Sequence, residues 1–171
     1  MTTDRIAAAT ERRIRAYIAE HQLLTGVHRL VVGFSGGPDS TALLLLAAEI
    51  HADCEAIHFN HGLRGRAAED DAVWCRAFCR QKGIRFQTTK LPVARKRRQR
   101  ESIEMAARRL RLEHWRTLLG EDPTAAAALG HHLDDKIENF FLRLMRGSNA
   151  GGVTGLRNLT TINGVKFLRP L

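Results

Sequence analysis

The segment Leu30-Val31-Val32-Gly33-Phe34-Ser35-Gly36-Gly37-Pro38-Asp39-Ser40-Thr41 decides the fold of this chain. An apolar run enters a turn of small residues, 35–40, here called the phosphate loop, and the chain leaves it as the apolar stretch 42–48. A strand, a glycine turn and a helix in this order bind phosphate, because backbone N–H groups converge on the anion and the helix dipole adds positive partial charge. A kinase-type loop, G-x-x-x-x-G-K-[ST], would supply a lysine for the terminal phosphates. This segment has no lysine and places Asp39 where the helix begins. A carboxylate beside a polyphosphate needs a divalent cation between them, so the segment predicts a magnesium–nucleotide site of another kind.

The composition is that of a globular protein with one domain. The chain has 171 residues, of which 44% are hydrophobic, and this suffices for one core. No apolar stretch is long enough to cross a membrane, and residues 1–5 do not lead into the apolar core of a signal peptide, so we expect a cytoplasmic protein. Three cysteines are too few for a disulfide framework. Cys75 and Cys79, four residues apart on an expected helix, are predicted to form a buried structural pair rather than a metal or redox site.

The charge of the chain is strongly positive and unevenly placed. Lys and Arg number 27 against 18 Asp and Glu, which gives a net charge of +9. Residues 91–120 hold nine basic and three acidic side chains, so most of the excess lies there. Clustered arginine is typical of proteins that bind a polyanion, and we favour nucleic acid; a solvated, solubilising face is the alternative. The densest part, residues 94–100, is here called the basic segment and is expected to be a mobile loop. It carries Arg95, Lys96, Arg97, Arg98 and Arg100.

Apolar periodicity predicts one helix followed by alternating strands and helices. This alternation indicates an α/β fold, a Rossmann-like three-layer domain whose mainly parallel sheet is covered on both faces. Residues 1–28 are expected to be an N-terminal helical segment packed on a domain formed by residues 29–171. No linker or repeat marks a second folded domain. The expected helices are 4–24, 41–50, 67–82, 101–119 and 134–146, and the expected strands are 29–34, 54–59, 84–91, 124–130 and 165–168.

The carboxyl ends of the expected strands are where a ligand should bind, because parallel α/β sheets hold ligands at that edge. The second strand leads into His58-Phe59-Asn60-His61-Gly62-Leu63-Arg64-Gly65. There His61 and Arg64 are candidates for contacts with a nucleotide or a phosphate. Taken alone, a glycine turn with incidental polar residues explains this stretch as well.

The fourth expected strand leads into Gly130-His131-His132-Leu133-Asp134-Asp135-Lys136-Ile137-Glu138-Asn139. Its carboxylates suit magnesium, which prefers oxygen ligands, and its histidines suit substrate contact or general-base work. A helix start with acids in its first turn is the structural alternative, and the adjacent histidines lack the spacing of a zinc site. Arg143 and Arg146 share a face of the same helix and are candidates for phosphate contacts or for capping the helix end. On the helix after the basic segment, Arg109 could reach the ligand edge, but solvated charge is the default there.

Several stretches together carry a resemblance to a known family. Residues 35–40 resemble the S-G-G-x-D-S signature of the N-type ATP pyrophosphatase superfamily. Residues 58–64, 131–139 and 142–148 resemble H-V-N-H-G-L-R, H-H-x-D-D-Q-x-E-T and L-R-L-x-R-G-S, and residues 104–108 resemble an E-x-x-A-R helix. In this order the motifs are similar to those of the tRNA(Ile)-lysidine synthetase family, over residues 30–171.

The resemblance implies an adenine nucleotide alpha hydrolase-like fold and the use of ATP and Mg²⁺. It implies that ATP adenylates the C2 oxygen of the wobble cytidine in the anticodon loop of tRNA(Ile), with release of pyrophosphate, and that free lysine then displaces AMP to form lysidine. Asp135 is a candidate for orienting the lysine ammonium or removing its proton. The implied cofactor site comprises Ser35, Gly36, Gly37, Pro38, Asp39, Ser40, His61 and Arg64. The implied catalytic residues are Asp39, His131, His132, Asp134, Asp135 and Glu138, of which Asp39 and Asp135 bind the metal. The implied RNA contacts are Arg95, Lys96, Arg97, Arg98, Arg100, Arg143 and Arg146.

The sequence departs from the family pattern in a few places. Lys136 and Asn139 stand where the family has glutamine and threonine, and residues 149–152 change the glycine spacing. Family members continue beyond a stretch such as 169–171, so their tRNA-binding C-terminal domains are expected to be absent from this chain. The alternatives are another tRNA-modifying ATP pyrophosphatase, although a thiolase should carry C-x-x-C pairs that this sequence lacks, or a truncated nucleotide- or RNA-binding module without catalysis. The oligomeric state is not predicted.

Overall fold

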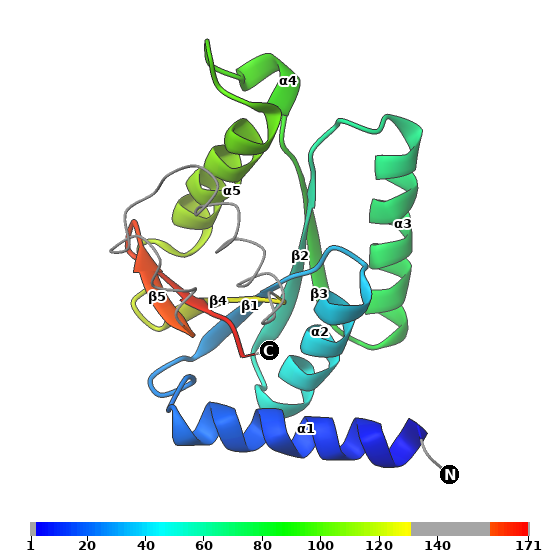
Figure 1. Cartoon of the computed structure of the whole chain (residues 1–171), viewed down its shortest axis with the longest axis vertical. Coiled ribbons are helices and arrows are strands. Elements are labelled where there is room, and N and C mark those ends of the chain that lie inside the picture. Colours follow the sequence, from blue (N-terminus) through cyan, green and yellow to red (C-terminus); the bar gives the residue numbers. More distant parts are fainter. Residues whose placement is uncertain (1–2, 131–157, 171) are drawn as a thin grey trace, which may run out of the picture.

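The computed structural model describes residues 3–130 and 158–170. One long helix precedes a βα alternation, and a short hairpin closes the described part of the chain (Figure 1). The elements are α1 (Thr3–Glu20), β1 (Arg29–Gly33), α2 (Pro38–Ile50), β2 (Cys54–Asn60), α3 (Arg66–Gln81), β3 (Arg85–Lys90), α4 (Val93–Lys96), α5 (Ile103–Leu119), β4 (Ala125–Leu129), β5 (Leu159–Ile162) and β6 (Val165–Leu168).

A single six-stranded sheet forms the middle layer, with the order β3-β2-β1-β4-β6-β5. All neighbouring pairs are parallel except β5 with β6. The central strands are apolar because both of their faces are covered: β4 reads AAAAL, and its four alanines are buried. The mainly parallel three-layer fold predicted from the sequence is therefore confirmed.

Helices cover the two faces of the sheet. Leu30 and Val32 point to the core shared with α2 and α3, whereas Val31 points to the core on the other side, which contains Trp115 and Leu119 of α5. The alternation follows from the two-residue period of a strand. α1 crosses the base of the molecule in Figure 1, below α2. Tyr17 and Ile18 of α1 pack against the first of these cores.

Several predicted boundaries were wrong. The helix after the phosphate loop begins at Pro38 rather than at residue 41, because proline is favoured in a first helical turn. The first helix ends at Glu20 rather than at residue 24. The basic segment is not a loop throughout, since Val93–Lys96 form α4.

The hairpin of β5 and β6 contains a strand that was not predicted. Asn163 and Gly164 connect the two strands, and both have positive φ, at 51° and 83°. Asn-Gly is a strong signal for a two-residue hairpin turn, so the sequence contained the information that predicts β5. The final strand, Val165–Leu168, was predicted with its observed bounds.

On α3 the buried residues are Ala68, Cys75 and Cys79, which confirms the predicted buried cysteine pair. Val73 and Trp74 are exposed to 67% and 50%. The helix therefore turns small side chains and thiols to the sheet and leaves an indole ring at the surface.

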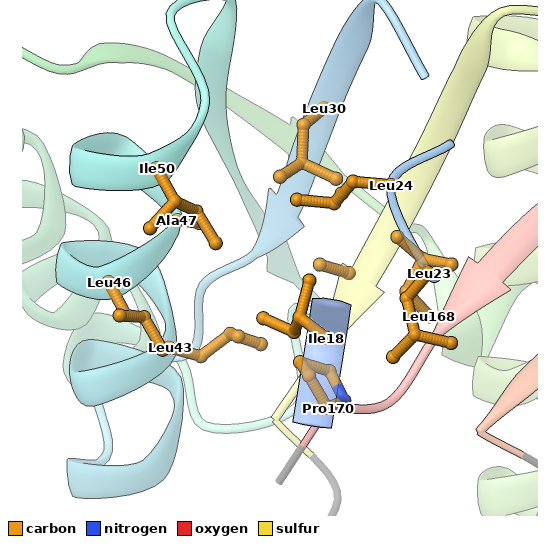
Figure 2. A pocket seen from close by; sticks show the side chains of 11 residues that line it. Ile18, Leu23, Leu24, Leu30, Leu43, Leu46, Ala47, Ile50, Leu168 and Pro170 are labelled. Atoms are coloured by element: carbon orange, nitrogen blue, oxygen red, sulfur yellow. The ribbon is translucent and has the colours of Figure 1, made fainter. Parts of the chain in front are cut away.

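An apolar cavity of about 20 Å³ lies between α1, α2 and the sheet (Figure 2). Ile18, Leu43 and Leu30 point into it from these three elements, and Pro170 closes one side. The space would fit one water molecule but offers it no hydrogen-bond partner, so it is expected to stay dry. Its apolar lining offers a polar ligand no partner.

Within the described part of the chain, no helix combines the length and the apolar character that a membrane span requires.

Candidate phosphate-binding site at the carboxyl edge of the sheet

The carboxyl ends of β1, β2, β3 and β4 lie at one edge of the sheet. The register pairs Gly33 with Ile57 and with Leu129, and Asn60 with Lys90. The phosphate loop follows β1, the His61 stretch follows β2 and the basic segment follows β3. The predicted gathering of these polar segments at one edge is therefore confirmed for the described residues. β1 and β4 are neighbours although β2 and β3 come between them in the chain, which is the type of position where α/β sheets bind ligands.

The phosphate loop is closed by a ring of three hydrogen bonds. The Gly37 N–H donates to Ser35 Oγ at 3.3 Å, and Ser40 Oγ donates to the Gly37 carbonyl at 3.0 Å. Because the Ser40 proton is used in that bond, Ser35 Oγ donates to Ser40 Oγ, at 3.0 Å. Gly37 is also the N-cap of α2 and makes no side-chain cap. The loop thus holds its shape by its own hydroxyl groups and leaves the start of α2 facing the edge without a side-chain cap.

The back of the loop rests on α3. Gly36 has φ of +87°, and a Cβ added there would lie 3.1 Å from Cys75 Sγ and 3.3 Å from the ring of Trp74. Glycine is required at this position by both the conformation and the space. The Trp74 ring stacks on Phe78 at 5.3 Å between centroids. A small aromatic cluster on α3 therefore supports the loop at Gly36.

Two buried polar side chains hold the strand ends, and sequence reasoning assigned them no role. His58 Nδ1 lies 2.9 Å from the Phe34 carbonyl oxygen, so it carries the proton and donates to the residue just before the phosphate loop. Asn60 accepts from the Gly62 N–H at 2.8 Å and donates to the Ala68 carbonyl at 3.1 Å. Both side chains are almost fully buried. They fix the loops after β1 and β2 through backbone contacts.

His61 and Arg64 differ in their surroundings. His61 is half-buried, and its buried Nδ1 has no hydrogen-bond partner within the described residues. Burial lowers the pKa of His61, and the charges of Arg111 and His58 lower it further. Arg64 is exposed and pairs with Asp71 of α3 at 2.6 Å. The structure thus places His61 near the cationic Arg111 at the ligand edge, while Arg64 pairs with an acid on the surface of α3.

Arginines of α5 and of the segment after β6 add positive charge near the site. For Arg108 and Arg111 the sequence left open a choice between phosphate contact and solvated charge. Burial lowers the pKa of Arg111, and the charge of Arg108 lowers it further. Arg108 also acts on Arg169, which is 5% exposed and donates to Thr160 Oγ1 at 3.2 Å. Within the described residues neither Arg108 nor Arg111 forms an ion pair. The signal in the sequence was their three-residue spacing, which puts both on one face of a helix.

The other predicted residues of the phosphate loop differ in their exposure. Asp39 and Ser35 are exposed at the edge, whereas Ser40 is buried beneath it. In the described residues, no group of three His, Cys, Asp or Glu side chains is arranged to hold a metal ion. The predicted residues that lie outside the described part are His131, His132, Asp134, Asp135, Glu138, Arg143 and Arg146.

Comparison with known proteins identifies the family. The PP-loop domain matches residues 6–171, which is nearly the whole chain.

The chain belongs to the PP-loop domain family.

Curated relatives of this PP-loop domain carry tRNA-modification names. The "tRNA(Ile)-lysidine synthase" of Bacteroides thetaiotaomicron is 36% identical over 166 residues, and that of Geobacillus kaustophilus is 33% identical over 163 residues. The alignments cover 94% and 92% of this chain but 37% and 35% of those relatives. The "Bifunctional protein TilS/HprT" of Listeria monocytogenes serotype 4b is 36% identical, over 94% of this chain and 26% of that protein. The PP-loop domain therefore spans about a quarter to a third of the length of these curated relatives.

A solved structure shares the fold of the PP-loop domain. It is the "U34-tRNA thiolase NcsA from Methanococcus maripaludis with its [4Fe-4S] cluster", which superposes with a TM-score of 0.76 over 99% of this chain and 60% of that one. The two sequences are 20% identical, so the likeness concerns the fold alone.

Proposed function

We propose that this PP-loop domain is the catalytic part of a tRNA(Ile)-lysidine synthetase, which cleaves ATP between the α and β phosphates to adenylate a tRNA base. The observation that carries the proposal is the phosphate loop, whose backbone faces the ligand edge with Asp39 in place of a lysine. The names of the relatives support this choice of acceptor. Such an activity belongs in the cytoplasm.

The residues of the loop suit the pyrophosphate end of ATP. Gly36 and Gly37 expose backbone at the start of a 13-residue helix, where an anion is stabilised by N–H groups and by the helix dipole. Asp39 in the first turn, with Asp135, would hold Mg²⁺, an ion that prefers oxygen ligands and keeps several waters. The bound ion would neutralise charge on the leaving pyrophosphate.

The cationic groups around the loop suit the RNA. Arg108 and Arg111 gather positive charge at the ligand edge beside His61, and the basic segment adds more. A wobble cytidine in an anticodon loop is single-stranded, so it can be unstacked and brought to the loop at small cost. His131, His132, Asp134, Asp135 and Glu138 would then line the place where cytidine and lysine meet, with Asp135 orienting the lysine ammonium or taking its proton.

The test supplies ATP, Mg²⁺, labelled lysine and unmodified tRNA(Ile), and measures lysine in tRNA together with AMP and pyrophosphate. We expect the unaltered chain to form all three products, and Asp39→Asn to lose at least a hundredfold in rate while keeping its thermal midpoint, because Asp39 is exposed. Asp70→Asn, an exposed aspartate of α3, is the matched control. Release of ADP instead of AMP would contradict cleavage between the α and β phosphates.

The second candidate is a nucleotide- and RNA-binding module without catalysis. The basic segment favours it. It predicts saturable binding of ATP and RNA with no AMP in the assay above. AMP and pyrophosphate without lysine in the tRNA would indicate a different acceptor.

A further inference from the structure

Arg109 of α5 is the centre of a compact hydrogen-bond network. Its Nε and Nη2 donate to the two carboxylate oxygens of Glu101, at 2.9 and 2.8 Å. Nη2 also donates to the Lys96 carbonyl at 2.9 Å, and Nη1 to Glu113 at 3.1 Å. The Arg109 side chain is 20% exposed and that of Glu101 is 11% exposed. A two-pronged, largely buried pair of this kind has a defined geometry and resists screening by salt.

The same network binds the backbone of the basic segment at two points. Lys96 is held through its carbonyl, and the Arg98 N–H donates to Glu101 Oε2 at 3.0 Å. Between these anchors and α5 the chain turns sharply, and Arg100 has φ of +63°. In Figure 1, α4 and the turn that follows it stand above α5 at one end of the molecule. The segment therefore has a fixed path although its side chains are exposed.

The segment carries five cationic side chains. Arg95, Lys96, Arg97, Arg98 and Arg100 are all exposed, and within the described residues none of the five pairs with an acid. Glu101 is the nearest acid in the sequence, and Arg109 occupies both of its oxygens. Five exposed cations that form no ion pair among the described residues, beside the edge that carries the phosphate loop, are complementary to a polyphosphate backbone.

We propose that the Glu101–Arg109 pair pre-shapes the basic segment as a docking surface for the RNA backbone. The inference rests on the proposed function, in which this segment contacts tRNA. Glu101 and Arg109 are positioning residues, since they act through the path of the chain. Pre-organisation lowers the conformational entropy that binding would otherwise remove, and so it strengthens binding without adding a contact.

The decisive comparison is between Glu101→Gln and Glu113→Gln. Each variant removes one carboxylate beside Arg109 and raises the net charge by the same amount, but only Glu101 also binds the Arg98 backbone. Electrostatics alone predicts that both variants bind RNA more tightly. We expect Glu101→Gln to bind an anticodon stem-loop roughly five- to tenfold more weakly than Glu113→Gln, with the same salt slope, because the number of phosphate contacts is unchanged.

Trypsin cleavage without RNA gives a second readout. The five basic residues are trypsin sites, and we expect Glu101→Gln to be cut there roughly tenfold faster than Glu113→Gln, because the ordered path opens more often. Arg109→Lys keeps the charge but loses the two-pronged geometry, and it should behave as Glu101→Gln does. This variant replaces Glu101→Gln if the latter does not fold.

Equal RNA affinity and equal cleavage of the two glutamine variants would overturn the proposal while leaving the RNA contact of the proposed function intact. If the unaltered chain shows no salt-dependent RNA binding, the docking role fails even where ATP cleavage to AMP continues. The proposal also fails if the unaltered chain binds RNA in a salt-dependent way and both glutamine variants bind it more tightly by the same factor. The basic segment would then act as a flexible cationic surface.

Discussion

Gly130, at the end of β4, lies directly against the backbone of Ser40 at the start of α2. A Cβ added to Gly130 would be 3.1 Å from the Ser40 backbone nitrogen and 3.2 Å from the Asp39 carbonyl carbon. Ninety residues separate the two positions in the chain, and the parallel pairing of β1 with β4 brings them together. The strand that leads to residues 131–139 therefore leaves the sheet in contact with the phosphate loop.

Gly130→Ala should push β4 and the phosphate loop apart. Overpacking against backbone costs about 1–3 kcal/mol, and the displaced groups are those that face the ligand. We expect a lower urea midpoint together with weaker ATP binding, measured by calorimetry. Thr161→Ala, on the exposed side of β5, is a control of similar size and should change neither value. Normal ATP affinity in Gly130→Ala would show that the loop is insensitive to the strand end.

His58→Leu should destabilise the fold more than His58→Asn does. Leucine leaves the Phe34 carbonyl buried without a donor, at a cost of about 1–3 kcal/mol, whereas the asparagine amide can replace Nδ1 as the donor. Urea unfolding of both variants checks this order. If the two midpoints fall equally, the bond to Phe34 contributes nothing specific to the position of the phosphate loop.

The cysteines should be inert in the folded protein. Burial raises the pKa of Cys54 and Cys75 to about 12 and that of Cys79 to about 11. For the first two the thiolate fraction at pH 8 is then about a thousand times smaller than for a thiol of pKa 9. We expect three thiols to react with a disulfide reagent in urea and almost none in buffer. Rapid reaction of Cys75 in buffer would contradict this expectation. It would indicate local opening beside Gly36, which lies against the Cys75 sulfur.

Acid should release the basic segment over a defined pH range. The hydrogen bonds from Arg109 and from the Arg98 backbone lower the pKa of Glu101 to about 2, from about 4.5. Because this pKa is lowered in the folded state, the ionised Glu101 carboxylate stabilises the fold. Its contribution to the free energy of unfolding is fully present above pH 4.5 and is lost as the pH falls toward 2. We expect the stability of the unaltered chain to fall more steeply than that of Glu101→Gln in this range. If stability falls with pH equally in the unaltered chain and in Glu101→Gln, the lowered pKa of Glu101 is contradicted.

Neutralising the five cations of the basic segment should weaken RNA binding and flatten its salt dependence. Each lost phosphate contact removes about 0.7–0.9 from the log–log slope. A filter-binding series between low and moderate salt measures this change. An unchanged slope would show that the basic segment is a solvated surface that does not contact RNA phosphates. This result does not depend on the comparison between Glu101→Gln and Glu113→Gln.

The sequence predicted the centre of the fold well because burial there dictates composition. Residues 30–32 and 125–128 are apolar on both faces of their strands, and the glycines of the phosphate loop follow from its geometry. The buried pair Cys75 and Cys79 follows from a four-residue helical spacing. In each case the local pattern and the tertiary surroundings require the same residues.

Long-range partners could not be predicted from local patterns. Arg109 reads as a solvated charge, yet it is one-fifth exposed because Glu101 lies opposite it across a turn. Trp74 reads as an apolar member of its helix, yet half of it is exposed while its ring lies against Gly36 and stacks on Phe78. Such contacts depend on how distant segments meet, and a single sequence contains no direct signal for that.

The two buried supports at the strand ends have a consequence for how this edge can diversify. His58 and Asn60 hold main-chain atoms of Phe34, Gly62 and Ala68, so the path of the loop after β2 does not depend on which exposed side chains that loop carries. Substitutions at exposed sites such as Leu63 and Arg64 can then alter what is recognised without moving the backbone beside the phosphate loop. Acceptor choice and nucleotide chemistry are separable traits in such a scaffold, and each can change by mutation while the other is kept.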